Sequence, residues 1–451
     1  MPVSNKNTLG VYVSIPFCRS KCTYCNFASG VYPASEHARY VERVVQDLTA
    51  AGEWAAQMGV DLPRRVDTIY LGGGTPSLLE PALLARLFGV MRAEFDVEAD
   101  AEITVECAPG QIADETLEAL AAAGVNRVSL GVQSFIDREA QVSGRLHGRK
   151  IVEQDLRRLR EAGIANLNVD LIAGLAGQTF ASWEESLEAV VESGVAHASV
   201  YMLEVDEDSR LGREMLAGGA RYHADLIPMD DAIAQMYERA IERLGQAGLE
   251  QYEISNFSRA GFRSRHNLRY WERRPYLGVG LDASSMLRGA GAEHGKALEV
   301  DPEENTSGAK APVDFDGKMY GLKPVPFDKA SPSASPLEEF VLRSTTTDAL
   351  GAFLEGPQPA ETAWLSPERQ HEEAWFLGLR LNAGVDVAAV EREFGREMVA
   401  AAMEVVGRLV EDGLLSSDGK AVRLTARGRM VSNDVFQEFL GADAEDCVLS
   451  R

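Results

Sequence analysis

The feature that most constrains the fold is an alternation of two hydrophobic patterns between residue 11 and about residue 280. Short runs rich in β-branched residues are typical of strands. They cover 11–16, 66–72, 103–108, 127–133, 166–173 and 197–205. Longer amphipathic runs, typical of helices, begin near residue 35 and then cover 81–95, 114–123, 150–162, 180–193 and 230–247. Because βα units in series form a parallel sheet covered by helices, we predict an α/β fold with a partial barrel of about six units.

The rest of the chain has a different character. Residues 286–336 are rich in small and polar residues without periodicity, which predicts a flexible insert or linker. From residue 337 onward the pattern is mainly helical, and 405–415, 421–424 and 425–439 indicate helix, short hairpin and helix. We therefore expect three parts: the barrel over 1–285, the insert over 286–336, and a small winged-helix-like domain over 337–451.

Composition narrows the partners and the compartment. The formal net charge of −24 opposes binding to nucleic acid, although a local group of arginines could still bind a small anion. The arginines in question are Arg263, Arg265, Arg269, Arg273 and Arg274. No apolar run reaches the ~18 residues that cross a bilayer, so no membrane span is expected, and peripheral membrane contact is left open. A polar start without a signal-like apolar stretch predicts a cytoplasmic protein.

Cys18, Cys22 and Cys25 form a C-x3-C-x2-C motif directly after the first predicted strand. Three thiolates can bind three irons of a [4Fe–4S] cluster and leave the fourth iron open to S-adenosylmethionine (SAM). The alternative is a zinc site, which normally needs four Cys or His ligands and a second ligand pair that this region lacks. Cys107 and Cys447 stand apart and are not expected to be ligands.

The cysteine loop, residues 18–25, resembles that of the radical SAM superfamily. The resemblance implies that Tyr24 packs on the adenine of SAM, and that Gly73, Gly74 and Thr75 let the backbone approach its methionine amino group. Further positions match SAM-binding residues of the oxygen-independent coproporphyrinogen III oxidases: Tyr12, Glu106, Gln133, Arg145 and Asp170. Taken singly, the two carboxylates have a simpler structural explanation at helix N-termini.

Within that family, the sequence is more similar to the haem chaperones, HemW, than to the oxidases. The oxidase pattern has a further cysteine where this chain has Phe27, and a longer segment before the cluster than the 17 residues that precede Cys18 here. The segment His266-Asn267-Leu268-Arg269-Tyr270-Trp271 matches one tied to haem binding in the chaperones. The resemblance implies that His266 and Tyr270 contact haem, with Trp271 stacking and nearby arginines at the propionates. A lone histidine is otherwise more often a structural hydrogen bonder.

These observations favour a haem chaperone that binds haem or a related tetrapyrrole and transfers it to an acceptor apoprotein, such as a respiratory enzyme. An electron donor for the cluster is implied, and cleavage of SAM is compatible with the motif. One alternative is a coproporphyrinogen III oxidase, which Phe27 opposes. Another is a radical SAM enzyme that modifies nucleic acid, which the acidic composition opposes.

Overall fold

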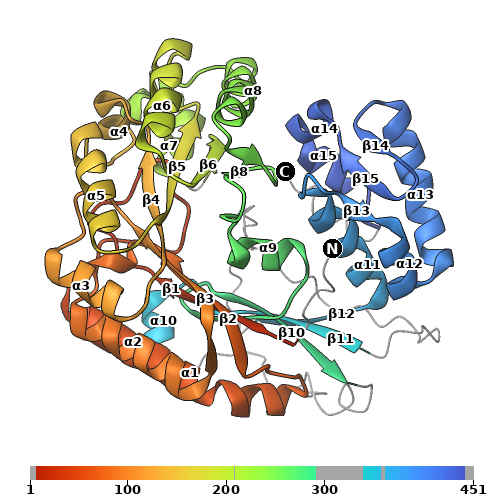
Figure 1. Ribbon diagram of the computed structural model, residues 1–451, viewed down its shortest axis with the longest axis horizontal. Helices are drawn as coiled ribbons and strands as arrows, with labels where there is room; N and C mark the ends of the chain where they lie inside the picture. The colour runs from red at the N-terminus through yellow and green to blue at the C-terminus, as the bar shows by residue number, and fades with distance from the viewer. Residues whose placement is uncertain (1–6, 208, 291–338, 357–360, 442–451) are drawn as a thin grey trace.

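The predicted strands lie side by side in one parallel sheet (Figure 1). The computed structural model describes residues 7–207, 209–290, 339–356 and 361–441. The strands follow one another in space as they do in sequence. They are β1 (Leu9–Ile15), β2 (Arg65–Gly73), β3 (Asp96–Cys107), β4 (Arg127–Gln133), β5 (Asn166–Ala173) and β6 (His197–Met202). The predicted partial (β/α)6 barrel is therefore confirmed.

Helices connect these strands and cover the outer face of the sheet (Figure 1). They are α1 (Ser35–Met58), α2 (Pro81–Glu94), α3 (Asp114–Ala122), α4 (Asp137–Val142), α5 (Arg149–Glu161) and α6 (Phe180–Ser193), with the 3-10 turn η1 (Pro76–Leu78). After β6 come α7 (Arg210–Leu216), the 3-10 segment η2 (Arg221–Leu226) and α8 (Asp230–Gln246). Within the described residues, no helix is both long enough and apolar enough to cross a bilayer.

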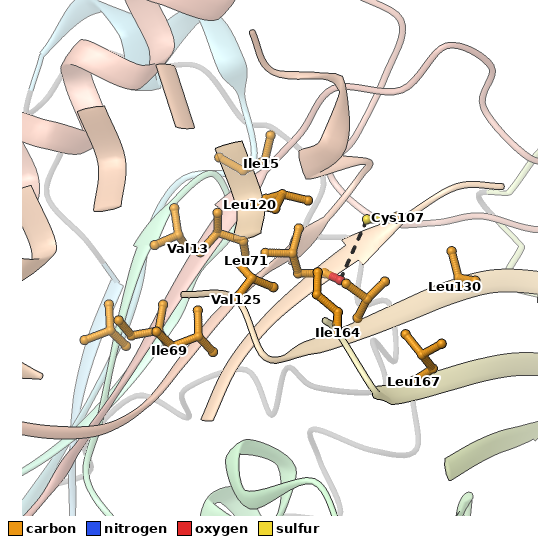
Figure 2. Close-up of a cluster of buried hydrophobic side chains, with 14 of the residues drawn as sticks. Val13, Ile15, Ile69, Leu71, Cys107, Leu120, Val125, Leu130, Ile164 and Leu167 are labelled. Carbon is orange, nitrogen blue, oxygen red and sulfur yellow. Dashed lines mark hydrogen bonds between the residues drawn. The ribbon is translucent and has the colours of Figure 1, made fainter. Parts of the chain in front are cut away.

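The main hydrophobic core lies between the sheet and these helices (Figure 2). Val128, Leu130 and Val132 of β4 are fully buried in it. Since side chains alternate along a strand, the residues between them face the other side, and there they line a central pocket. Cys107 is 4% exposed and belongs to the same core, with its thiol 4.0 Å from the Val105 carbonyl oxygen (Figure 2). The sheet thus has one apolar face and one largely polar face.

Further strands extend both edges of this sheet. Beyond β6 lie β8 (Asn256–Ser258) and β7 (Glu250–Gln251). Beyond β1 lie β9 (Tyr276–Gly280), which is parallel to β1, and then the antiparallel strands β10 (Ser284–Ala290), β11 (Glu339–Thr345) and β12 (Glu361–Leu365). The helix α9 (Arg265–Trp271) precedes β9, and α10 (Leu350–Glu355) lies between β11 and β12.

The sequence-based boundaries differ from the structure at this edge. β10 continues into the predicted insert. β11 pairs with β10, and β12 pairs with β11, so these two strands extend the barrel sheet instead of opening the helical C-terminal domain. The reason is that β10 and β11 pair across a long sequence separation, for example at Met286 and Arg343, and a local pattern does not report such pairing. The remainder of the predicted insert lies outside the described residues, as does Cys447.

The C-terminal part forms a small second core beside the barrel (Figure 1). Its elements are α11 (Pro367–Leu379), β13 (Val385–Asp386), α12 (Val387–Phe394), α13 (Arg396–Glu411), β14 (Leu415–Ser417), β15 (Ala421–Leu424), α14 (Ala426–Met430) and α15 (Ser432–Gln437). Trp375, Phe394 and Val406 are among its buried side chains. The hairpin of β14 and β15 after α13 confirms the predicted winged-helix-like order.

Candidate functional site

A pocket of about 960 Å³ occupies the polar side of the barrel. Chemistry in folds of this kind collects at the C-terminal ends of the parallel strands, and the cysteine loop leaves β1 at that end. The residues predicted to bind the cluster and SAM, and His266 and Tyr270 of the predicted haem contacts, line this pocket: Tyr12, Cys18, Cys22, Tyr24, Cys25, Gly73, Gly74, Thr75, Glu106, Gln133, Arg145, Asp170, His266 and Tyr270. The structure thus brings together residues from the five strands β1 to β5, from three loops and from the helix α9.

Backbone hydrogen bonds hold the cysteine loop against the barrel. The Cys18 N–H donates to the Gly30 carbonyl at 2.9 Å, which closes the base of the loop. The Thr23 N–H donates to the Ser143 carbonyl at 3.2 Å, which ties the middle of the loop to the end of α4. The loop therefore has a fixed position at the mouth of the pocket.

Each loop thiol has a polar neighbour that suits a metal-bound sulfur. The Thr75 hydroxyl lies 4.0 Å from Cys18 Sγ, and the Arg145 guanidinium donates to Cys22 Sγ at 3.4 Å. Ser29 Oγ lies 3.9 Å from Cys25 Sγ. Such hydrogen bonds to sulfur tune iron–sulfur clusters.

The donor set fits an iron–sulfur cluster better than a single metal ion. Burial raises the pKa of the Cys18 and Cys25 thiols, and the neighbouring loop thiols raise it further. The three sulfurs all line the pocket, and thiolate sulfur is the soft donor that iron–sulfur clusters take. Three soft thiolates without a fourth ligand are what a cluster with one open iron requires, and so the residues present fit the predicted [4Fe–4S] group.

The glycine stretch after β2 packs against the start of the cysteine loop. The Gly74 N–H donates to the Ile15 carbonyl at 2.8 Å. A side chain at Gly74 would place its Cβ 2.8 Å from the carbonyl oxygens of both Ile15 and Phe17. Gly73 has φ of +99°, a conformation that other residues rarely adopt. Only glycine satisfies both positions, and the glycines bring this backbone to the edge of the pocket.

Glu106 is fixed at the end of β3 by two donors. The Tyr70 hydroxyl donates to Oε1 at 2.7 Å, and the Gly73 N–H donates to Oε2 at 3.1 Å. Burial raises the pKa of Glu106 to about 7, although both hydrogen bonds favour the ionised form. With a pKa near neutrality, the Glu106 carboxyl group can pair with a cationic group of a ligand or form a hydrogen bond with it. Tyr70 was not singled out from the sequence, because a strand tyrosine carries no motif.

Asp170 is held in the same way on β5. Ser129 Oγ donates to Oδ2 at 3.0 Å, and the Asn168 amide donates to Oδ1 at 2.7 Å. Burial raises the pKa of Asp170, and these hydrogen bonds counteract part of the increase. The simpler explanation considered for Glu106 and Asp170, at helix N-termini, is therefore not what the structure shows for either, since both lie on strands and face the pocket.

Arg145 and Gln133 lie next to each other at the end of β4. Gln133 has φ of +70° and follows an irregularity in the pairing of β4 with β5. The Arg145 guanidinium also donates to the Gly131 carbonyl. Arg145 thus connects the strand end to Cys22, and its charge lies between the cysteine loop and the centre of the pocket.

His266 lies on α9, lines the pocket and is 1% exposed. Its Nδ1 is 2.9 Å from Thr68 Oγ1, and its Nε2 is 2.9 Å from the Tyr270 hydroxyl. Burial, with Arg269 and Arg127 nearby, holds the pKa of His266 well below its ordinary value. The imidazole is therefore neutral, as an iron ligand must be, and both of its nitrogens have protein partners.

Two further expectations for this segment are wrong. Trp271 does not line the pocket; it packs against Phe376 and Leu377, and the Arg380 guanidinium lies 4.2 Å from its ring. The arginines are also occupied: Arg269 and Arg274 bind Asp67, and Arg273 binds Glu393 at 2.6 Å. Trp271 and these arginines stabilise the packing of α9 against the elements around it. The sequence alone could not distinguish this structural role from ligand binding.

Several pocket residues come from the edge strands that the sequence did not predict. Tyr276 of β9 and Ser284 of β10 line the pocket, together with residues 345–348 at and after the end of β11 and Glu361 of β12. The short apolar run Phe340-Val341-Leu342 was the available signal for β11. The edge strands lie beside the site because they pair with strands that are distant in the sequence.

Known proteins resemble this chain over most of its length. The sequence matches the description "Radical SAM superfamily" over residues 12–190 and "HemN C-terminal domain" over residues 365–431. It is 30% identical to "Heme chaperone HemW" of Lactococcus lactis subsp. lactis (strain IL1403), over 95% of this chain and 96% of the relative. It is 31% identical to "Heme chaperone HemW" of Bacillus subtilis (strain 168), over 95% of this chain and 98% of the relative.

A solved structure supports the fold. The structure described as "Coproporphyrinogen III oxidase (HemN) from Escherichia coli is a Radical SAM enzyme" superposes with a TM-score of 0.72. The match covers 96% of this chain and 90% of the other chain at 21% identity. At that identity the likeness concerns the fold.

Proposed function

Because the chain belongs to the HemW family of radical SAM proteins, we propose that it is a haem chaperone that binds haem and transfers it to an acceptor apoprotein. The observation that carries this proposal is that His266 and Tyr270 of α9 open onto the same pocket as the cysteine loop. One protein can therefore hold a tetrapyrrole and a redox cofactor in a shared cavity.

Cys18, Cys22 and Cys25 are proposed to hold the [4Fe–4S] cluster. When bound, the cluster supplies the electron for reductive cleavage of SAM, and a separate electron donor is needed to recharge it. Thr75, Ser29 and the Arg145 guanidinium provide the polar contacts that stabilise the thiolate form of the ligands.

SAM is proposed to lie between the cysteine loop and the strand ends. Tyr24 and Tyr12 offer aromatic surface, and the backbone of 73–75 offers close approach without side chains. Glu106 and Asp170 present carboxylates to the amino and hydroxyl groups of SAM, while Arg145 and Gln133 offer N–H donors. Glu106, Asp170 and Arg145 are each held by hydrogen bonds to neighbours before any ligand arrives, so binding to them requires little reorganisation.

Haem is proposed to enter beside α9, with His266 and Tyr270 as its contacts. Since His266 Nε2 faces the Tyr270 hydroxyl, ligation of iron exchanges that hydrogen bond for a metal bond. Phe27 lines the pocket and is 41% exposed, and a phenyl ring neither binds iron nor exchanges protons. This side chain favours haem carriage over the proton-coupled decarboxylation expected of an oxidase.

The test is a titration of the anaerobically reconstituted full chain with haem, in parallel with tRNA at moderate salt. The proposal expects saturable haem binding at one site and no tRNA binding beyond that of a similarly acidic control protein. Binding of tRNA without binding of haem would favour a nucleic-acid-modifying enzyme instead.

A further inference from the structure

Arg127 is the first residue of β4, and its side chain is buried at the floor of the central pocket. It is 2% exposed. Ser129, Gly131 and Gln133 follow it on the same face of the strand, and all of them line the pocket. Gln133 lies six residues further along, which at ~3.3 Å per residue separates the two backbones by about 20 Å. Arg127 therefore lies at the end of the pocket that is remote from the cysteine loop.

Its guanidinium group has no protein partner. Over the part of the chain that the structure describes, neither a hydrogen bond nor an ion pair reaches this side chain, and its Nε is buried without an acceptor, as are those of Arg269 and Arg343. Other buried arginines of this chain differ: Arg269 binds Asp67 and two carbonyl oxygens, and Arg343 binds both carboxylate oxygens of Glu373. Since a buried charge without a partner is costly, an unpartnered arginine at the wall of a pocket indicates a missing anion.

The nearby carboxylates do not fill this role. Glu106 and Asp170 are close enough for Arg127 to lower their pKa values. Their oxygens, however, accept hydrogen bonds from other groups, namely Tyr70 and Gly73 for Glu106, and Ser129 and Asn168 for Asp170. The Arg127 guanidinium therefore keeps its donors for a ligand.

We propose that Arg127 is the anion-binding group of the pocket floor and that it binds a carboxylate of the tetrapyrrole, a propionate. The inference rests on the proposed function. Arg127 and His266 line the same pocket, so a macrocycle at His266 brings its propionates toward Arg127. SAM also carries a carboxylate, but Arg145 offers a guanidinium for it at the cluster end of the pocket. Planar guanidinium groups bind carboxylates through two parallel hydrogen bonds.

The test compares haem with haem dimethyl ester, in which the propionates carry no charge. The reconstituted full chain should bind haem on the order of 10- to 100-fold more tightly than the ester, the usual size of a charge-assisted contact. Arg127→Gln should weaken haem binding by a similar factor and leave the affinity for the ester within about threefold. Arg127→Lys keeps the positive charge but loses the planar guanidinium that makes two parallel hydrogen bonds, so its haem affinity should lie between those of the wild-type chain and Arg127→Gln. Arg65→Gln is the control for net charge, because Arg65 is exposed and pairs with Glu98 on the outer end of β2.

Each other outcome overturns the inference in a recognisable way. If the wild-type chain binds haem and the ester with equal affinity, the inference is overturned, and this result stands even if Arg127→Gln fails to fold. A loss of SAM affinity in Arg127→Gln with haem affinity unchanged would assign the carboxylate to SAM. An equal loss for haem and ester would mean that Arg127 only maintains the shape of the pocket. If the wild-type chain binds neither, the proposed function itself is wrong, whereas haem binding that is indifferent to Arg127 leaves that function standing.

Discussion

Replacing Asp67 by Asn should destabilise the barrel strongly, because this carboxylate neutralises two buried cations. Asp67 binds the guanidinium groups of Arg269 and Arg274 and accepts a hydrogen bond from the Thr8 hydroxyl. The Arg269 side chain is 0% exposed and that of Arg274 is 12% exposed. Burial lowers the pKa of Arg269 to about 10, and the Asp67 charge opposes that decrease.

The expected loss in unfolding free energy is about 3–5 kcal/mol, the usual cost of leaving a buried charge without its partner. Asn has nearly the shape of Asp, so no cavity contributes to this value. The matched control is Glu98→Gln, which removes the partner of the largely exposed Arg65. Exposed ion pairs contribute about 0.2–1 kcal/mol, so the two variants should differ several-fold.

Urea unfolding at neutral pH, followed by tryptophan fluorescence, measures both variants against the wild-type chain. Haem affinity of folded Asp67→Asn should stay within about twofold, because neither Arg269 nor Arg274 lines the pocket. A loss no larger than that of Glu98→Gln would refute the structural role given to the arginines. A selective loss of haem affinity in a stable Asp67→Asn protein would indicate that Arg269 and Arg274 help to bind haem.

Three further predictions concern the pocket. Replacing any one cysteine of the loop by Ala should abolish iron–sulfur absorbance and SAM cleavage, whereas Cys107→Ala should retain both, because burial raises the pKa of Cys107 to about 12 and keeps it a thiol. Glu106→Gln should remove a pH dependence of the unfolding free energy. In the ligand-free chain the native Glu106 carboxyl has a pKa of about 7, so it keeps its proton at pH values where the unfolded chain has lost it. The stability of the wild-type chain should therefore fall by about 2–3 kcal/mol relative to the variant from pH 5 to pH 8, and parallel stability curves for the two proteins would contradict this. His266→Ala should weaken haem binding and shift the Soret band while iron content stays at the wild-type level; an unchanged Soret band would exclude His266 as an iron ligand.

The barrel could be predicted from the sequence because its signals are local. The predicted strands 127–133 and 166–173 and the predicted helix 180–193 agree with β4, β5 and α6 residue by residue. Hydrophobic periodicity and flanking glycines define such elements within a dozen residues. The edge strands β10 to β12 were missed because their partners lie far apart in the sequence.

The candidate site could be predicted where its motif residues lie at the C-terminal ends of the parallel strands. The cysteine loop and the SAM-site residues meet because parallel strands end at the same edge of the sheet. The roles of Arg127, Arg269 and Trp271 could not be predicted, since each depends on which side chain lies opposite. A buried arginine with a partner and one without look the same in a sequence.

The measurement that tests the account most directly is made on one anaerobically reconstituted sample that carries both cluster and SAM. Haem binding is followed by its Soret absorbance, and conversion of coproporphyrinogen III by the decarboxylated products. The account predicts saturable haem binding and no decarboxylation above that of a cluster-free sample. Decarboxylation at a rate typical of enzymes, on the order of one turnover per second or more, would contradict it and identify the chain as an oxidase.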